Sequence, residues 1–141
     1  MALPATMSTP LRAPERWVLA VAALVASVAH IPVTPEHLTE APYMGVLFVL
    51  LSVACVVLAG IALVRDVPAV YLASAAVCGL AIVGYAATRL VAFPMLGDDV
   101  GNWLEPLGVV SILSEAVVVG AALSALRRGF GRPGRTQLSN L

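Results

Sequence analysis

Glu115 is an acid in the middle of a long apolar run, and it has the strongest potential for chemistry in this chain. It is the only charged residue between Pro106 and Leu126. If that run crosses a membrane as a helix, Glu115 lies about 15 Å from either interface. A charge at that depth costs at least ~2.5–3.5 kcal/mol, so the acid must be neutral, paired or turned toward the protein interior. Ser111 and Ser114 lie on adjoining helical positions and can donate hydrogen bonds to it.

Two functional interpretations of Glu115 follow from this position. An intramembrane acid indicates a proton or cation site, or the counter-ion of a ligand. The alternative is a neutral acid that joins helices through a hydrogen bond. We favour the first interpretation.

Arg89 lies about one helical turn inside the end of another apolar run, and Tyr85 precedes it by four residues on the same helical face. Arg89 can extend to the lipid headgroups, or it can turn inward and pair with Glu115, with Glu40 or with the Asp98-Asp99 pair. In the inward arrangement, Tyr85, Arg89 and Glu115 line one cavity that opens to the outside, with His30 at its rim. An arginine there also suits an anionic headgroup or a carboxylate ligand.

Both histidines and several acids occur in two polar segments that separate apolar runs. Imidazole and carboxylate ligands suit zinc, copper, manganese or iron, which makes a divalent metal a candidate cofactor. The same acids also serve to cap helices and to solvate loops, and the sequence has no His-Glu-x-x-His motif. The candidate metal ligands are His30, Glu36, His37, Glu40, Asp98 and Asp99.

Local signals predict how these polar segments fold. Thr34-Pro35-Glu36 is typical of a helix start, with Thr34 as the cap, and predicts a short interfacial helix over residues 35–40. Asn102 and Glu105 match a capping box at the start of the last helix, which explains both residues without any function.

The elements that must position these residues are long and apolar. Of the 141 residues, 60% are hydrophobic and 11% are charged, whereas a soluble domain has about 25% charged residues. A soluble fold of this size cannot bury so much apolar surface. The sequence therefore predicts an all-α membrane protein with four transmembrane helices in an antiparallel up-down bundle. The expected spans are about 16–33, 43–64, 67–92 and 103–127, in a single domain of residues 16–128 with tails at 1–15 and 129–141.

The arginines predict the orientation of the bundle. The chain has eight Arg and no Lys, and seven of the arginines lie near the two ends or in the short link at residues 65–66. Segments rich in arginine that flank membrane spans stay on the cytoplasmic side. Both termini are therefore expected there, with segments 30–42 and 93–105 facing outward. The Ala-, Val- and Arg-rich composition without Lys favours a GC-rich bacterium and its plasma membrane. The basic residues are too few for nucleic-acid binding.

The first apolar run is the weakest of the four. Trp17 to Ala29 is apolar apart from Ser27, and the run reaches Val33 only if His30 and Pro32 are included. A competing interpretation is a cleaved signal peptide that ends at the small residues 27–29. A retained span is favoured because it gives an even number of crossings, with both basic ends on one side.

Two stretches carry a resemblance to other proteins. They are His-Ile-Pro-Val-Thr-Pro-Glu-His-Leu-Thr-Glu-Ala-Pro-Tyr, residues 30–43, and Gly-Asn-Trp-Leu-Glu-Pro-Leu-Gly, residues 101–108. On these stretches the chain resembles uncharacterised four-span integral membrane proteins of high-GC bacteria. The resemblance implies a fold and no activity.

Three function classes follow. The first is a membrane protein whose outward-facing polar pocket binds a cation, a proton or a small ligand, in transport or sensing. The second is a structural or accessory subunit, with the bilayer and another membrane protein or a second copy as partners. The third is an intramembrane lipid-modifying enzyme with His30 or His37 as base, which ranks last because no nucleophile–base pair is visible.

Overall fold

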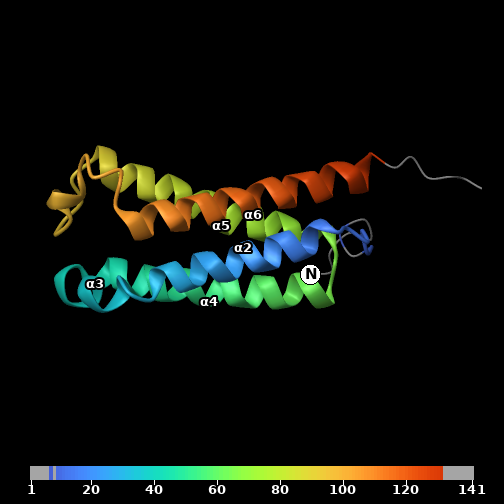
Figure 1. The fold of residues 1–141 in the computed structure, drawn as a ribbon, viewed down its shortest axis with the longest axis horizontal. Coiled ribbons are helices and arrows are strands. Elements are labelled where there is room, and N and C mark those ends of the chain that lie inside the picture. Colours follow the sequence, from blue (N-terminus) through green and yellow to red (C-terminus); the bar gives the residue numbers. More distant parts are fainter. Residues whose placement is uncertain (1–6, 8, 132–141) are drawn as a thin grey trace, which may run out of the picture.

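The computed structural model describes residue 7 and residues 9–131, and the regular elements in this part of the chain are all helical (Figure 1). The all-helical fold class predicted from the sequence is therefore confirmed. The elements are α2 (Glu15–His30), α3 (Thr34–Glu40), α4 (Pro42–Val64), α5 (Pro68–Leu90), the 3-10 helix η1 (Gly97–Asp99) and α6 (Pro106–Phe130).

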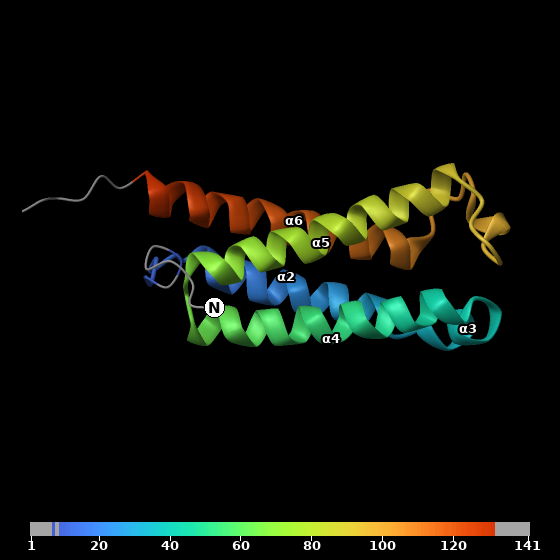
Figure 2. The same cartoon turned by 180° about the vertical axis from the view of Figure 1, so that it is seen from behind.

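The four longer helices α2, α4, α5 and α6 run alternately in opposite directions (Figures 1 and 2). α2 begins and α6 ends at the same end of the bundle, which we call the terminal end. α3 and η1 lie at the opposite end, which we call the loop end. α2 packs closely against α4 and α6, and α6 packs closely against α5. Among these adjacent pairs of longer helices, α4 and α5 make the fewest contacts.

Among the described residues, α4, α5 and α6 are long and apolar enough to cross a membrane. These helices are compatible with a multi-pass membrane protein. α2 has 16 residues and is too short by itself. α2 and α3 pass the same test together, as a pair bent by 48°. Pro32 accounts for the break, because proline has no N–H with which to continue the helical hydrogen bonds beyond Ile31.

Prolines also mark where the helices begin. α4, α5 and α6 each start at a proline, which has no N–H to satisfy and already has a helical φ. α5 ends at Leu90 and α6 begins at Pro106, within a few residues of the approximate span ends 92 and 103. The predicted capping box is wrong, since Glu105 precedes α6 without capping it by a side-chain hydrogen bond.

α3 is confirmed as a short helix, but its predicted cap is wrong. Thr34 lies inside the helix, and its hydroxyl donates a 2.7 Å hydrogen bond to the His30 carbonyl. This bond joins α3 to the end of α2 across the bend.

The core lies between α2, α4, α5 and α6, mainly in the terminal half of the bundle. Most of its side chains are small, and Leu19 and Tyr71 are the largest that are fully buried. Small residues let helix backbones approach closely, which drives packing where hydrophobic burial is weak. Large apolar side chains such as Val21 and Val28 instead point outward, as expected of a surface in contact with lipid. The buried small residues of this core include Ala20, Ala22, Ala23, Ala26, Cys55, Ala59, Ala62, Ala121, Ala122 and Ala125.

Asp66 ties the chain segment before α2 across the terminal end. Its carboxylate accepts a 2.8 Å hydrogen bond from the Ala13 N–H and a 2.5 Å hydrogen bond from the Tyr71 hydroxyl. Its carbonyl accepts a further bond of 2.8 Å from the Leu11 N–H. Asp66 is buried, so these donors replace the water that its charge loses.

Glu15 forms a second polar contact at the terminal end. Its Oε1 lies 3.0 Å from Arg128 Nε and accepts a 2.9 Å hydrogen bond from the Ser124 hydroxyl. These contacts join the start of α2 to the last turns of α6. The first and last helices are therefore held together where the chain enters and leaves the bundle.

Candidate functional site

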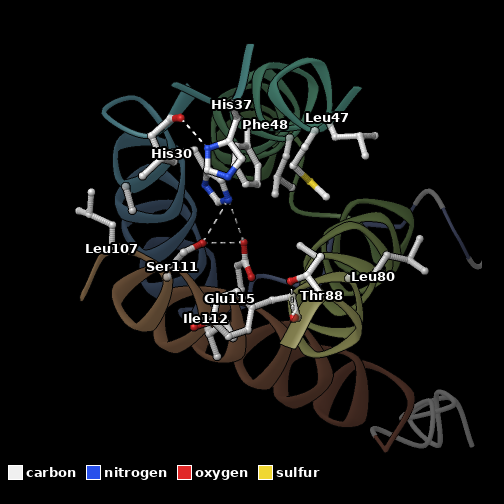
Figure 3. A pocket seen from close by; sticks show the side chains of 18 of the residues that line it. His30, His37, Leu47, Phe48, Leu80, Thr88, Leu107, Ser111, Ile112 and Glu115 are labelled. Carbon is white, nitrogen blue, oxygen red and sulfur yellow. Dashed lines mark hydrogen bonds and ion pairs between the residues drawn. The ribbon is translucent and has the colours of Figure 1, made fainter. Parts of the chain in front are cut away.

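A cavity of about 410 Å³ lies in the loop-end half of the bundle, where the end of α2 and α3 meet α4, α5 and α6 (Figure 3). This volume is within the range of small-molecule sites. Its walls on α4 and on the middle of α5 are mostly apolar, and its polar residues come from α2, α3, α6, the loop-end turns of α5 and the segment between α5 and α6. The titratable or hydroxyl-bearing residues that line it are His30, His37, Tyr85, Thr88, Arg89, Asp99, Glu105, Ser111 and Glu115.

Glu115, Ser111 and His30 form a buried hydrogen-bonded chain on one wall of the cavity (Figure 3). The Ser111 hydroxyl donates a 3.0 Å hydrogen bond to Glu115 Oε1 and lies 3.3 Å from His30 Nε2. His30 Nε2 lies 3.9 Å from the same carboxyl oxygen. Glu115 is 1% exposed, so this chain carries most of its polar contact.

The helices fix each member of the chain. Ser111 and Glu115 are one turn apart on α6 and so share a face. His30 is the last residue of α2, and its Nδ1 donates a 2.7 Å hydrogen bond to the Ala26 carbonyl. The Phe48 ring of α4 packs against both histidine rings. Its centroid lies 5.1 Å from that of His30 and 4.8 Å from that of His37. The His30 ring is therefore held by both a hydrogen bond and an aromatic contact.

This geometry accommodates one shared proton in two ways. Because Nδ1 donates to a carbonyl, Nε2 of a neutral His30 ring is an acceptor. With the proton on Glu115, the carboxyl donates to Ser111 and Ser111 donates to His30. With the proton on His30, the ring donates to Ser111 and Ser111 donates to Glu115. Both arrangements fill the chain with zero net charge, which suits a buried site.

Arg89 occupies the loop end of the cavity and turns inward instead of extending to the lipid headgroups, with 5% of its surface exposed. One terminal nitrogen, Nη1, lies 2.7 Å from Asp99 Oδ1, and the other, Nη2, lies 3.0 Å from Glu105 Oε2. Its guanidinium carbon lies 4.4 Å from the centre of the Tyr85 ring. Arg89 thus ties the end of α5 to η1 and to the residue that precedes α6.

Tyr85 approaches α6 closely because residue 108 is glycine. A Cβ at Gly108 would lie 2.6 Å from the Tyr85 ring. The Tyr85 hydroxyl donates a 3.1 Å hydrogen bond to the Trp103 carbonyl. The ring is therefore held between Gly108 and the guanidinium of Arg89, where it forms part of the cavity wall.

The charges around the cavity favour a cation. Three carboxylates, those of Asp99, Glu105 and Glu115, line it together with one guanidinium, that of Arg89. Because Glu115 and His30 together carry no net charge, the excess negative charge is that of Asp99 and Glu105 over Arg89. Arg89 is already paired with two of the three acids. An anionic ligand, which the sequence suggested from Arg89 alone, would meet excess negative charge here.

The structure brings His30, Tyr85, Arg89 and Glu115 to one cavity. His30 is buried within the wall instead of lying at the rim. Sequence reasoning assigned Glu105 to a capping box and so missed its contact with Arg89. The signal that could have found it is the need of a buried arginine for carboxylate partners.

The six candidate metal ligands are not brought together. In the described residues no three His, Cys, Asp or Glu side chains lie close enough to hold a metal ion. Glu36, Glu40 and Asp98 are exposed, and Asp99 is paired with Arg89. His37 Nδ1 donates a 2.8 Å hydrogen bond to the Val33 carbonyl. His37 and Asp99 line the same cavity, but among the described residues neither belongs to a group of three ligands that could hold a metal ion.

Comparison of the chain with protein-family models, curated protein sequences and solved structures gave no match. The interpretation of the cavity therefore depends on its own geometry and charge.

Proposed function

We propose that this chain is a four-span protein of the bacterial plasma membrane that binds a small cationic ligand in an outward-facing cavity. Both termini are cytoplasmic in this proposal. The arginines near the chain ends and in the link at residues 65–66 support that orientation. The bent pair of α2 and α3 supplies the fourth crossing.

The observation that carries the proposal is the surroundings of Glu115. It is a buried acid in the wall of a cavity, one of its oxygens is bonded to Ser111, and apolar side chains make up most of the other walls. An acid in such surroundings is neutral or paired. A cation in the cavity would supply the missing pair, and the proton shared with His30 would be released.

This exchange of a proton for a cation suits either transport or sensing. In transport, the cation and the proton would use the same site in turn. In sensing, the bound cation would hold α6 and the end of α2 in one arrangement. Both uses require that the ligand and the proton compete for Glu115.

The proposal is tested by two probes of the same shape and opposite charge, tetraphenylphosphonium and tetraphenylborate. The purified full chain in lipid nanodiscs is titrated with each probe, and binding is measured by calorimetry and by the shift in melting temperature. We expect the cation to bind and the anion not to bind. Glu115→Gln should weaken cation binding by about tenfold or more, because it removes the buried counter-charge.

Glu15→Gln is the matched control, because Glu15 is a buried acid at the terminal end, away from the cavity. It should leave cation binding unchanged. Equal binding of the two probes, or cation binding that is the same in Glu115→Gln as in the wild type, would contradict the proposal.

A further inference from the structure

We infer that the cation is an amphiphile, a long-chain amine or quaternary ammonium compound, that reaches the cavity from the bilayer between α4 and α5. This inference rests on the proposed function and names the ligand class and its route. Its charged group would lie at Glu115, and its alkyl chain would extend between the two helices into the lipid.

The first observation is the arrangement of the helices. α4 and α5 make the fewest contacts of the neighbouring pairs in the bundle. They nevertheless supply most of the apolar wall of the cavity. The weakest packing between neighbouring helices therefore coincides with the cavity, and it faces lipid if the helices cross a membrane.

The second observation identifies the mouth. Leu47 and Leu50 of α4 and Leu80 of α5 line the cavity, yet they are 52%, 60% and 71% exposed. A side chain that belongs to both the cavity wall and the outer surface marks an opening. Leu47 and Leu80 point outward on the two helices that flank it (Figure 3).

The third observation is the order of chemistry from the mouth inward. The mouth is formed by leucines, whereas Glu115, Ser111 and His30 lie on the opposite side, on α6 and α2 (Figure 3). An apolar mouth disfavours the passage of a hydrated ion, because the ion would lose its water before it gained a partner. An alkyl chain has no such desolvation cost, since it moves from the apolar interior of the bilayer to the apolar side chains of the leucines.

Small residues leave room for a chain inside the mouth. Ala54 of α4, with Ala81 and Gly84 of α5, lines the cavity, and a Cβ added at Gly84 would meet no atom within 4 Å. Toward the terminal end, Cys55 of α4 and Cys78 of α5 are both buried in the core. The mouth is therefore limited to the loop-end half of α4 and α5.

The test compares tetramethylammonium with decyltrimethylammonium on the full chain in nanodiscs. Leu80→Trp narrows the mouth from α5, and Leu47→Trp narrows it from α4. Val83→Trp is the matched control, because Val83 is 65% exposed on the same helix and does not line the cavity. Calorimetry measures the binding of each cation to each variant, and Glu115→Gln defines the binding that belongs to the site.

We expect both mouth variants to lower the affinity for decyltrimethylammonium by about tenfold. The indole would displace several methylene groups of the ligand from apolar contact. Tetramethylammonium binding should not change, and Val83→Trp should bind both cations like the wild type. If the mouth variants affect both cations equally, or neither, the route between α4 and α5 is wrong. If neither these two cations nor tetraphenylphosphonium binds the wild type, the proposed function itself fails.

Discussion

The two ends of the bundle use the same kind of residue, a buried acid, in opposite ways. At the terminal end, Asp66 accepts hydrogen bonds from a backbone N–H and from the Tyr71 hydroxyl. At the loop end, Glu115 accepts a hydrogen bond from the Ser111 hydroxyl and faces a cavity. An acid surrounded by donors and tight packing holds segments together, whereas an acid beside open space can bind something else.

Side-chain size accounts for much of this difference. In the terminal half, the alanines of α2, α4 and α6 allow close packing. In the loop-end half, α4 and α5 carry leucines that point outward instead of toward each other, such as Leu47 and Leu80. The four helices are therefore tightly packed at the terminal end, whereas α4 and α5 leave space between them at the loop end.

The largest effect should come from removing the terminal-end acid. Asp66→Ala leaves the Ala13 N–H and the Tyr71 hydroxyl without their acceptor, which should lower the free energy of unfolding by about 3 kcal/mol. Unfolding in mixed micelles with increasing SDS measures this change. Asp98→Ala removes an exposed acid at the loop end and should have no effect. Equal stability of the two variants would contradict the claim that the buried acid at the terminal end holds its segments together.

A smaller effect should come from the serine that bridges Glu115 and His30. Ser111→Ala leaves a buried carboxyl without its donor and should cost about 1–2 kcal/mol in the same unfolding measurement. Ser114→Ala is the matched control, because the Ser114 hydroxyl bonds only to the Val110 carbonyl of its own helix in the described residues. It should cost less than about 0.5 kcal/mol. Equal costs for both variants would mean that Ser111 does not support Glu115.

The smallest effect should come from the glycine beneath Tyr85. Gly108→Ala places a methyl group 2.6 Å from the ring, so the ring must move, at a cost of about 1 kcal/mol. Gly120→Ala is the matched control on the same helix, because a Cβ there meets nothing within 4 Å. It should stabilise the protein by up to about 1 kcal/mol through helix propensity. A stabilising Gly108→Ala would show that Tyr85 is free to move.

The helices could be predicted because apolar runs and prolines are local signals. The runs located α4, α5 and α6, and Pro35 indicated α3. The length of α2 was harder to predict from the sequence, because the apolar pattern continues past His30 while Pro32 interrupts the helix. Helix ends near polar residues were also uncertain, since Glu105 matches a cap motif but pairs with an arginine from another helix.

The site could be predicted only in part, for a different physical reason. The spacing of Tyr85 and Arg89 on one helix and the depth of Glu115 on another are readable from the sequence. Which acids pair with Arg89 depends on how a loop folds back, and that is a tertiary property. The gap between α4 and α5 depends on helix–helix distances, which no periodicity within one helix encodes.

The shortness of α2 has a consequence for the surrounding membrane. Its 16 residues cover about 24 Å, whereas the hydrocarbon layer is about 30 Å thick. If α2 crosses as proposed, the lipids beside it must thin, or α3 must fill the remaining depth at an angle. The protein would then deform the bilayer on one side only, and it would concentrate in thinner regions and beside neighbours that deform the bilayer in the same way.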